Sequence, residues 1–455
     1  MKAAAPIQHY LDLGAAAHID LLHANNRSGI HLIEDDSFSG FTPVGTYPKA
    51  LALGIAQQYE NSFTPAYVGQ QAFKPYDRRC IANVTYIGSA YVDLDTYHTE
   101  YAGWSFPEAW AAIQAQFPDL PTPTIAGSSG RGLQLVWCFK KGKPKQFYPH
   151  WQVLADTLVT ALKQFGADPK ARDLARVLRL SHSYNRKSGT RADLKQTGAP
   201  VTYEALQRWC NAHRKAQHEQ VAQHTPAPAA PDRDWTETGQ RRTAPDNVFK
   251  LATKNVYTLH AARMEDYRTL AGSRGGRFTD CRRTAVYLFA CSAAWFCHDE
   301  DTLINEVQAF TERYVDQSAK YTKQHIQEII KRQGEAKQGK TREFRGKEVD
   351  PRYKHRNSTI IDQLGITETE QHLLSTVIGN TEKMARERLR QGALRRKAGI
   401  LERTMYLAKV STVAQDRRQM ALGLAEQGLS SRRIARELKI GQTTVVRYLV
   451  TGEPL

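Results

Sequence analysis

The sequence predicts an α/β (α+β) amino-terminal domain followed by all-α segments, and two patterns lead to this prediction. As far as about residue 210, apolar β-prone runs alternate with amphipathic runs, which is typical of a sheet covered by helices. From residue 248 onward, the apolar residues recur at helical spacing. The 455 residues, 41% of them hydrophobic, suffice for roughly two to four domains with apolar cores.

The elements of the first domain follow from these runs. Strands are expected at residues 30–34, 66–69, 81–95, 123–126, 133–139 and 177–180, and helices at 107–116 and 148–165. Ser105 and Glu108 have the spacing of a capping box and Pro107 stands in the first turn, so that a helix should begin there.

Domain boundaries are expected where the chain becomes polar or rich in proline. The segments are a first domain at 1–212, a Pro/Ala-rich linker at 213–247, a helical domain at 248–335, a basic linker at 336–358, a basic helical segment at 359–410 and a terminal domain at 411–455. Within the helical domain, residues 284–296 are apolar enough for a buried helix, while 301–314 and 323–331 are amphipathic.

The charge of the chain indicates a polyanionic partner. Its formal net charge is +17, and residues 331–455 alone hold 26 Lys and Arg against 14 Asp and Glu, a balance of +12. The rest of the chain holds 37 against 32, a balance of +5. Because a strong basic bias in one region is typical of nucleic-acid binding, we expect the carboxy-terminal quarter to contact DNA or RNA.

Other partners are excluded by composition. No apolar run is long enough to span a membrane and the amino terminus lacks the apolar core of a signal peptide, so we expect a cytoplasmic protein with no membrane partner. The six cysteines have no Cys-x-x-Cys spacing and should be reduced thiols. Cys291, Cys297 and His298 lie in an apolar helical run, and no zinc site is predicted there.

A pair of aspartates ends one of the predicted strands. In Ala90-Tyr91-Val92-Asp93-Leu94-Asp95, the period of two places both carboxylates on the same face. Two aspartates offer the oxygen ligands that Mg²⁺ prefers and leave room for phosphates. Taken alone, such a pair is more often a set of helix caps or solvated loop residues than a metal site.

Two further motifs follow the aspartates. Residues 125–137 form a Gly/Ser-rich turn that leads into a strand, where Arg131 and backbone N–H groups could hold phosphate; the alternative is a tight hairpin with an exposed arginine. Residues 166–187 contain Asp168, Asp173 and six basic residues around a short strand. Arginines on a strand beside an acidic cleft suggest triphosphate binding; the alternative is a solvated helix with an Asp173–Arg176 ion pair.

In this order the three motifs resemble those of the archaeo-eukaryotic primase superfamily, above all the primases and primase-polymerases of plasmids and other mobile elements. That family has a strand ending in Asp-x-Asp, a Ser/Gly turn leading to a strand, and a third acid. Its plasmid members continue with Asp-x-x-Arg-x-x-Arg and Asn-x-Lys, which here read Asp173, Arg176 and Arg179, then Asn185 and Lys187. The resemblance spans roughly residues 80–190.

The resemblance implies a nucleotidyltransferase that makes primers on single-stranded DNA with two Mg²⁺ or Mn²⁺ ions. Asp93 and Asp95 would hold the ions, and Asp173 would complete the carboxylate set, with Asp168 as the alternative. One ion would lower the pKa of the primer 3′-hydroxyl and the other would neutralise the leaving pyrophosphate.

The same resemblance implies nucleotide contacts. Ser129, Arg131 and Gln134 would meet the phosphates of the incoming nucleoside triphosphate. The family often has His where Gln134 stands, and Leu-Pro-Gly-Thr where residues 180–183 read Leu-Ser-His-Ser; both departures put details of nucleotide contact in doubt. The residues implied along the nucleotide or template path are Arg176, Arg179 and Lys187.

Residues 421–449 read as three short helices whose pattern resembles a helix-turn-helix of resolvase type. The expected core is Leu424, Ile434, Ala435, Leu438, Ile440, Val445 and Leu449. Ser430 or Ser431 would cap the second helix. The residues expected to contact duplex DNA are Gln442, Thr443, Thr444 and Arg447 in the major groove and Arg432, Arg433 and Arg436 at phosphates. Such folds also dock proteins, but the basic stretch 383–397 nearby favours DNA.

Other functions remain open. Residues 334–341 match the phosphate-loop pattern G-x-x-x-x-G-K-[ST], but an amphipathic helix precedes them and no apolar helix follows, so we expect a chance match. The alternatives to a primase are an origin-binding initiator with an inactive primase-like core and, less favoured, a metal-dependent glycosyltransferase. The sequence leaves open whether the primer is RNA or DNA and whether a separate helicase takes part.

Overall fold

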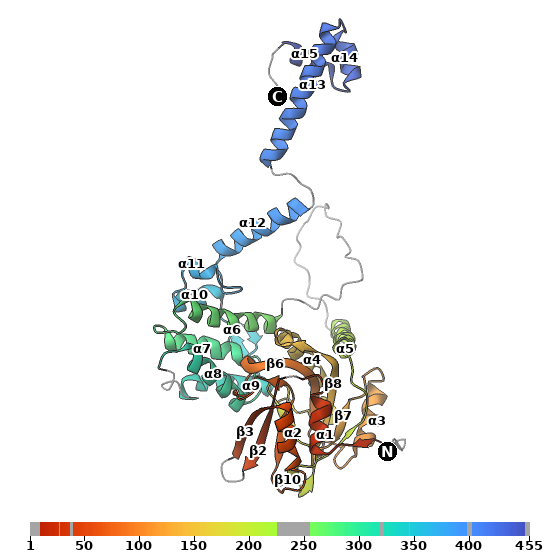
Figure 1. Cartoon of the computed structure of the whole chain (residues 1–455), viewed down its shortest axis with the longest axis vertical. Helices are drawn as coiled ribbons and strands as arrows, with labels where there is room; N and C mark the ends of the chain where they lie inside the picture. The colour runs from red at the N-terminus through yellow and green to blue at the C-terminus, as the bar shows by residue number, and fades with distance from the viewer. Residues whose placement is uncertain are drawn as a thin grey trace. The chain divides into compact units, whose positions relative to one another are not determined.

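The computed structural model describes residues 10–26, 28–36, 40–224, 255–317, 323–344, 346–397 and 403–450. The chain divides into two compact units, residues 1–378 and 379–455 (Figure 1). The first unit contains a sheet domain and a helical domain, and the second contains helices. The expected α/β (α+β) core followed by helical domains is therefore confirmed.

An antiparallel sheet forms the centre of the first domain (Figure 1). Its strand order is β1-β12-β7-β8-β6-β5-β2-β4-β9, with β3 beside β2. The strands are β1 (Leu11–Asp12), β2 (Gly29–Asp36), β3 (Gly40–Pro48), β4 (Ala66–Gly69), β5 (Ala72–Phe73), β6 (Val84–Leu94), β7 (Ile125–Ser128), β8 (Leu133–Pro144), β9 (Val177–Arg179) and β12 (Asp193–Gln196). A separate ribbon pairs β10 (Tyr184–Asn185) with β11 (Thr190–Arg191).

Helices cover this sheet. They are α1 (Ala15–Leu22), α2 (Lys49–Gln57), α3 (Phe106–Gln116), α4 (Tyr148–Ala161) and α5 (Tyr203–His224), with short 3₁₀ turns η1 (Ile81–Asn83), η2 (Thr96–His98), η3 (Lys145–Phe147) and η4 (Lys163–Phe165). The capping box before α3 is confirmed, since the Ser105 N–H donates to Glu108 Oε2 at 2.7 Å. Helix α4 packs on β6, where Trp151 Nε1 donates to the Ser89 carbonyl at 2.8 Å and its ring contacts that of Tyr91.

The six expected strands are present as β2, β4, β6, β7, β8 and β9, and the two expected helices as α3 and α4. Strand β3 was not expected, because two prolines and two glycines weaken a strand pattern; it forms by pairing with β2 across a register shift between Leu32 and Ile33. Helix α5 runs to His224, so residues 213–224 of the expected linker are helical. Residues 225–247 of that linker lie outside the described residues.

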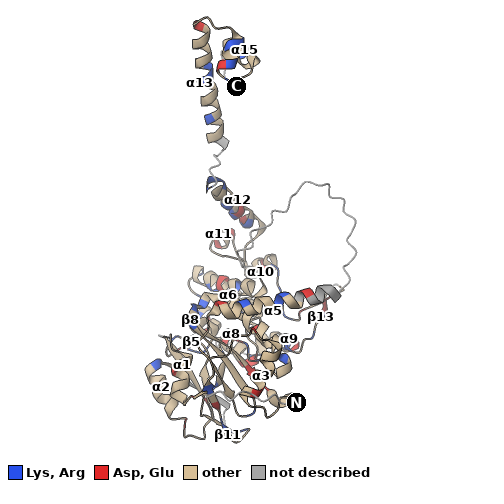
Figure 2. Ribbon diagram, turned by 90° about the vertical axis from the view of Figure 1, so that its right-hand side faces the viewer, with Lys and Arg blue, Asp and Glu red and all other residues tan. Residues whose placement is uncertain are grey.

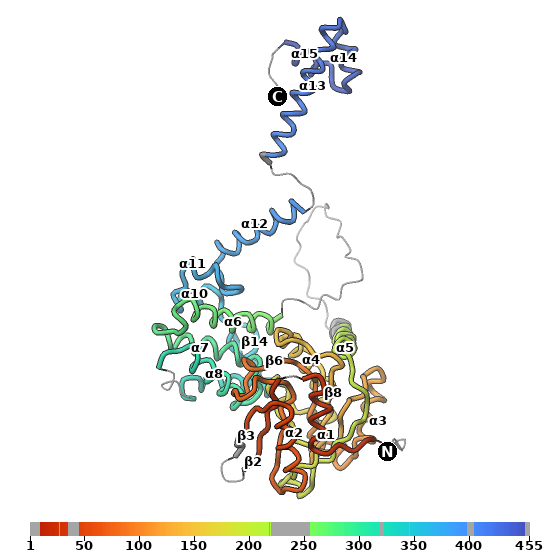
Figure 3. The backbone as a smooth tube through the Cα atoms, in the orientation of Figure 1, coloured from red at the N-terminus to blue at the C-terminus, as the bar shows by residue number. Residues whose placement is uncertain are grey.

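The helical domain contains α6 (Val256–Ser273), α7 (Arg282–Ala293), α8 (Glu300–Tyr314), η6 (Lys323–Ile326), α9 (Gln327–Lys337), the hairpin β13 (Arg342–Phe344)–β14 (Lys347–Val349), α10 (Asn357–Leu364) and α11 (Glu368–Gln371). As expected, α7 is buried, and its Phe289 stacks on Phe310 of α8 with ring centroids 3.9 Å apart. The backbone trace shows these helices beside the sheet domain (Figure 3).

The helical domain extends further than the sequence suggested. The Asp266 carboxylate in α6 accepts hydrogen bonds from the N–H groups of Ser375, Thr376 and Val377 at 2.7, 2.7 and 2.8 Å. These bonds tie residues up to 377 to the first unit, so the boundary after Ile378 lies inside the expected basic segment 359–410. Gly334 lies within α9 and a 3₁₀ turn precedes that helix, so the match at 334–341 lacks the strand that a phosphate loop needs.

The second unit holds α12 (Asn380–Lys397), α13 (Arg403–Glu426), α14 (Ser431–Glu437) and α15 (Gln442–Val450). Basic side chains outnumber acidic ones along α12 (Figure 2). Helices α13 to α15 enclose a small core of Ala421, Ile434, Val445 and Tyr448, against which Leu424, Ala435, Leu438, Ile440 and Leu449 pack. Every apolar residue expected in this core is there. In the part of the chain that the structure describes, no helix is long and apolar enough to cross a membrane.

Candidate active site

The aspartate pair lies at the end of β6, a long strand near the middle of the sheet. Asp93 is the penultimate residue of β6, directly opposite Gln134 of β8, and Asp95 follows the strand. Directly opposed residues of an antiparallel pair share a face, so the side chains of Asp93 and Gln134 are neighbours. Gln134 is buried, and its Oε1 has no hydrogen-bond partner within the protein. A buried acceptor without a partner costs free energy unless a ligand or water satisfies it.

The loop of residues 166–176, which we call the acidic loop, brings a third carboxylate to this pair. The Asp95 N–H donates to the Gly166 carbonyl and the Asp168 N–H donates to the Asp93 carbonyl, both at 2.8 Å. Gly166 adopts φ +90°, and a Cβ there would lie 2.8 Å from the Asp95 carbonyl oxygen, so glycine permits this close approach. The acidic loop is thus fixed to the end of β6, with Asp168 beside the aspartate pair.

The charge of Asp168 acts on both members of the aspartate pair. Burial, and then the charges of Asp95 and Asp168, raise the pKa of Asp93 from 3.8 to about 7. Burial and Asp168 also raise the pKa of Asp95, against the hydrogen bond of Tyr97 and the charge of Arg131. Like charges raise one another's pKa when no cation compensates them, and this pattern is common at functional sites.

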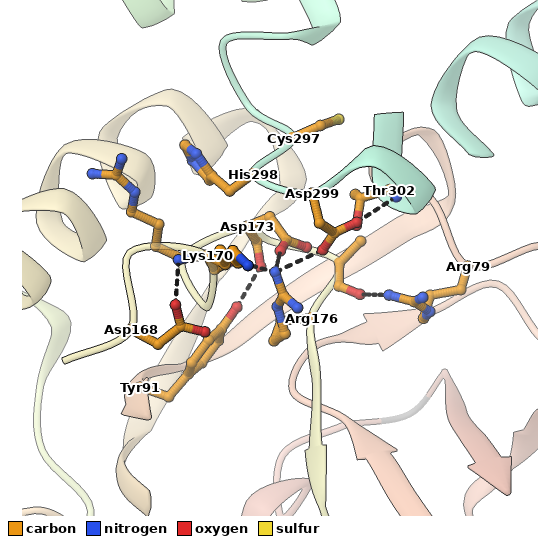
Figure 4. Close-up of polar contacts among 12 residues, drawn as sticks. Arg79, Tyr91, Asp168, Lys170, Asp173, Arg176, Cys297, His298, Asp299 and Thr302 are labelled. Atoms are coloured by element: carbon orange, nitrogen blue, oxygen red, sulfur yellow. Dashed lines mark hydrogen bonds and ion pairs between the residues drawn. The ribbon is translucent and has the colours of Figure 1, made fainter. Parts of the chain in front are cut away.

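Asp173 lies elsewhere, in a buried cluster of charges (Figure 4). Its fully buried carboxylate pairs with Arg176, whose Nη2 also lies 2.8 Å from Asp299 Oδ2 in the helical domain. Arg79 donates to the Ala175 carbonyl and adds a second positive charge near both acids. Burial raises the pKa of Asp173 and Arg176 opposes it. Of the two candidates for the third acid, Asp168 accompanies Asp93 and Asp95, while Asp173 is paired with arginine.

The Gly/Ser turn stands next to the aspartates. The Arg131 guanidinium stacks on the Tyr97 ring with its Cζ 4.5 Å from the centroid, and its charge reaches Asp95. The Ser129 carbonyl accepts a hydrogen bond from Asn185 Nδ2 at 2.8 Å. Gly130 has φ +115°, and a Cβ would lie 2.2 Å from that amide, so only glycine fits. Asn185 therefore joins the second motif to the third.

The remaining predicted nucleotide contacts differ in their surroundings. Arg179 on β9 donates to the Tyr67 hydroxyl at 2.8 Å and lies over its ring, while its charge reaches Asp93. Lys187 is exposed. Arg176 is engaged by Asp173, Asp299 and the Lys170 carbonyl, so its guanidinium is committed to the protein.

The side-chain oxygens at the end of β6 are of the kind that bind divalent cations. It offers three carboxylates and, beside them, the unpartnered oxygen of Gln134. Oxygen donors of this kind are those that Mg²⁺ and Mn²⁺ take. Within the described ranges, however, no three His, Cys, Asp or Glu side chains are close enough together to form a finished metal site. The three carboxylates are neighbours, but in the described structure they do not surround one common point.

In the second unit, the residues predicted to meet DNA lie on the surface of α14 and α15. Arg432, Arg433, Arg436, Gln442, Thr443 and Arg447 are exposed, and Thr444 is half-buried. Ser430 occupies the N-cap position of α14, without a side-chain hydrogen bond to the helix, and Gln442 Nε2 donates to Ser431 Oγ at 3.3 Å. Their common exposure leaves this face open to a partner.

Three residues of the site were not found by the sequence analysis, and a fourth, Asn185, was named there only as part of a motif. Tyr97 supports Arg131, Asn185 links two motifs, Arg79 contacts the acidic loop, and Asp299 reaches Arg176 from another domain. Asn185 belongs to the Asn-x-Lys motif and could have been assigned a role from it. Asp299 could not, because no local pattern signals a contact across 123 residues of sequence.

Comparison with known proteins finds similar solved structures and one similar protein sequence. The similar solved structures are a primase-polymerase domain and two structures of a primase. No protein-family model matches the chain.

The similar proteins are one replication protein and three solved structures. A replication protein of Clostridium perfringens is 23% identical over 378 residues, which cover 82% of this chain and 81% of that protein. The AEP domain of the cyanophage S-2L primase-polymerase is 16% identical, covering 43% of this chain and 96% of the domain, with a TM-score of 0.32. The catalytic domain of primase RepB′ in complex with initiator DNA is 16% identical, covering 46% and 100%, with a TM-score of 0.30. A second RepB′ structure covers 71% of this chain and 94% of its own, at 14% identity and the same TM-score.

Proposed function

We propose that the chain is a replication primase or primase-polymerase of a plasmid or other mobile element, which joins nucleotides on a single-stranded DNA template. The observation that carries the proposal is the set of carboxylates at the end of β6, where burial and the charge of Asp168 raise the pKa of Asp93 and Asp95, with Arg131 and Arg179 beside it. Three acids flanked by arginines suit a triphosphate that is bound with divalent ions. The replication protein of Clostridium perfringens, similar along most of its length, supports the same assignment.

The roles of the residues follow from their surroundings. Asp93, Asp95 and Asp168 would hold Mg²⁺ or Mn²⁺, and two such ions would activate the primer 3′-hydroxyl and neutralise the leaving pyrophosphate. Arg131, held against Tyr97, presents a guanidinium to phosphate oxygens beside Asp95. Gln134 lies opposite Asp93 in the sheet, and its unpartnered acceptor could orient a water or a hydroxyl there.

We assign the third carboxylate to Asp168. Asp168 raises the pKa of both other acids, whereas Asp173 is buried against Arg176 and does not figure among the charges that act on them. Mn²⁺ binding tests this choice. Asp168→Asn should weaken Mn²⁺ binding about tenfold or more, since it removes an anionic ligand, while Asp119→Asn, at an exposed position, should leave it unchanged. Equal binding by both variants would contradict the assignment.

The second unit would bind duplex DNA. Exposed arginines on α14 and the exposed polar face of α15 suit phosphates and base edges. Its basic side chains, those of α12 included, would make the affinity for DNA strongly dependent on salt.

A priming assay tests the function as a whole. The full chain is incubated with single-stranded DNA, labelled nucleotides and Mg²⁺ or Mn²⁺, and the products are separated by size. Template-dependent short products that need the metal support the proposal. Retention of DNA without any product on varied templates would instead support an inactive origin-binding initiator. Activity toward a nucleotide sugar would support a glycosyltransferase.

A further inference from the structure

The acidic loop contacts the helical domain as well as the sheet domain. At its start it is bonded to the end of β6, and after residue 176 the chain enters β9, which pairs with β4. Between these fixed ends, the loop's own bonds are few: the Ala171 N–H donates to the Asp168 carbonyl and the Arg176 N–H to the Asp173 carbonyl, both at 3.1 Å, and the Lys170 N–H donates to Asp168 Oδ1 at 2.9 Å. The loop therefore depends on side chains for its shape.

Arg176 is the side chain that closes the loop. Its Nη2 donates back to the Lys170 carbonyl, across the segment that follows Asp168, and pairs with Asp173 (Figure 4). The same Nη2 reaches Asp299 Oδ2 at 2.8 Å, at the start of α8. Two carboxylates, one from each domain, thus hold one guanidinium over the loop.

Asp299 is itself fixed by the helical domain. Its Oδ1 accepts the Thr302 N–H at 2.6 Å as the N-cap of α8, which leaves Oδ2 for Arg176. Burial raises the pKa of Asp299, but Arg176 and the Thr302 hydrogen bond outweigh burial and hold it below its ordinary value. Asp299 is therefore ionised, and its charge is directed at Arg176 by the helix that it caps.

His298, the residue before Asp299, also acts on the acidic loop, through Gln152. His298 Nε2 lies 3.0 Å from Gln152 Nε2, and this Gln152 amide donates to the Arg172 carbonyl at 2.8 Å. Since His298 is buried and burial lowers its pKa well below the ordinary value, its ring is neutral and Nε2 can accept the hydrogen bond. Residues 298 and 299 thus hold two points of the acidic loop.

We propose that the helical domain completes the candidate active site, and that Asp299 is a positioning residue which keeps Asp168 in place by holding Arg176 over the acidic loop. This inference rests on the proposed function for its catalytic consequence. Its structural half, that Asp299 orders the loop, stands on the contacts alone. Arg176 would accordingly be a residue that orders the site and not one that binds nucleotide.

The test compares two neutral substitutions on the same helix. Asp299→Asn keeps an N-cap acceptor for Thr302, since Asn and Asp cap equally well, but replaces the Arg176 acceptor by an amide. Glu312→Gln removes the exposed ion pair with Arg78, 2.8 Å long, which crosses the same domain junction without touching the loop. Any loosening of the junction in general would affect both variants.

Hydrogen exchange of the metal-free full chain is the first readout. Asp299→Asn should speed amide exchange in residues 166–176 about tenfold or more, while α8 itself and the Glu312→Gln variant stay at the wild-type rate. The second readout is the Mg²⁺ concentration for half-maximal priming, which should rise about tenfold for Asp299→Asn alone, with the template KM unchanged. Equal behaviour of the two variants in either readout would overturn the inference. A wild type that exchanges as expected but makes no product would instead refute the proposed function.

Discussion

Removing the charge of Asp93 should stabilise the metal-free protein. The neighbouring acids and burial raise the pKa of this carboxyl from 3.8 to about 7, so the folded state binds its proton more tightly than the unfolded state does. At 1.36 kcal/mol for each pKa unit, this difference corresponds to a cost of about 4 kcal/mol once the carboxyl is ionised. Because Asp93 keeps some exposure to solvent, we expect Asp93→Asn to recover about 2–4 kcal/mol at pH 8.

The sign of the pH dependence follows from the same pKa. Between about pH 4 and pH 7 the folded state holds a proton that the unfolded state has lost, so the wild type loses stability as the pH rises through this window. The gain from Asp93→Asn should therefore be larger at pH 8 than at pH 5. All seven tryptophans lie within residues 1–378, so urea unfolding followed by tryptophan fluorescence reports on this unit.

The control for this experiment is Asp119→Asn, which removes an exposed carboxyl. It should change the free energy of unfolding by less than about 0.5 kcal/mol at either pH. If Asp93→Asn destabilised the protein, or stabilised it equally at pH 5 and pH 8, the reasoning about repulsion among the carboxylates would be refuted.

Three further predictions concern other parts of the chain. Arg131→Ala should raise the nucleotide KM in priming about tenfold with little change in stability, because the guanidinium is exposed where it stacks on the Tyr97 ring; an unchanged KM would count against phosphate contact. Ile434→Ala should destabilise the second unit by about 2–5 kcal/mol, since Ile434 is fully buried in its core. On heating, part of the helical circular dichroism should therefore be lost at a lower temperature than in the wild type. Arg433→Ala should weaken duplex binding for all sequences and reduce the slope of log K against log salt by about one; an unchanged slope would argue against a phosphate contact.

Local patterns predicted much of the sheet domain. The six expected strands and two helices are all present, because each is a period-2 or period-3.6 run with a recognisable end, such as the capping box of Ser105. Strand β3 is different, since its prolines and glycines have no strand propensity and only the pairing with β2 holds it. Tertiary pairing of this kind leaves no trace in the local sequence.

The candidate site was predictable as a set of motifs but not as a geometry. Asp93, Asp95 and Gln134 could be placed together, because a strand and its antiparallel neighbour fix which side chains share a face. Asp168 and Asp173 are five residues apart in one loop, and only the folded loop decides which of them faces the pair. The role of Asp299 could not be predicted from the sequence, because its partner Arg176 belongs to another domain.

Pyrophosphate release is the measurement that tests the central claim most directly. The full chain, single-stranded DNA, nucleoside triphosphates and Mn²⁺ are combined, and pyrophosphate is measured beside incorporated nucleotide for the wild type and for Asp93→Ala/Asp95→Ala. The account predicts one pyrophosphate for each nucleotide joined by the wild type, and neither product from the double variant. Pyrophosphate and incorporation at the same rate in both proteins would contradict the assignment of these carboxylates, and neither product from a wild type that binds DNA would contradict the primase itself.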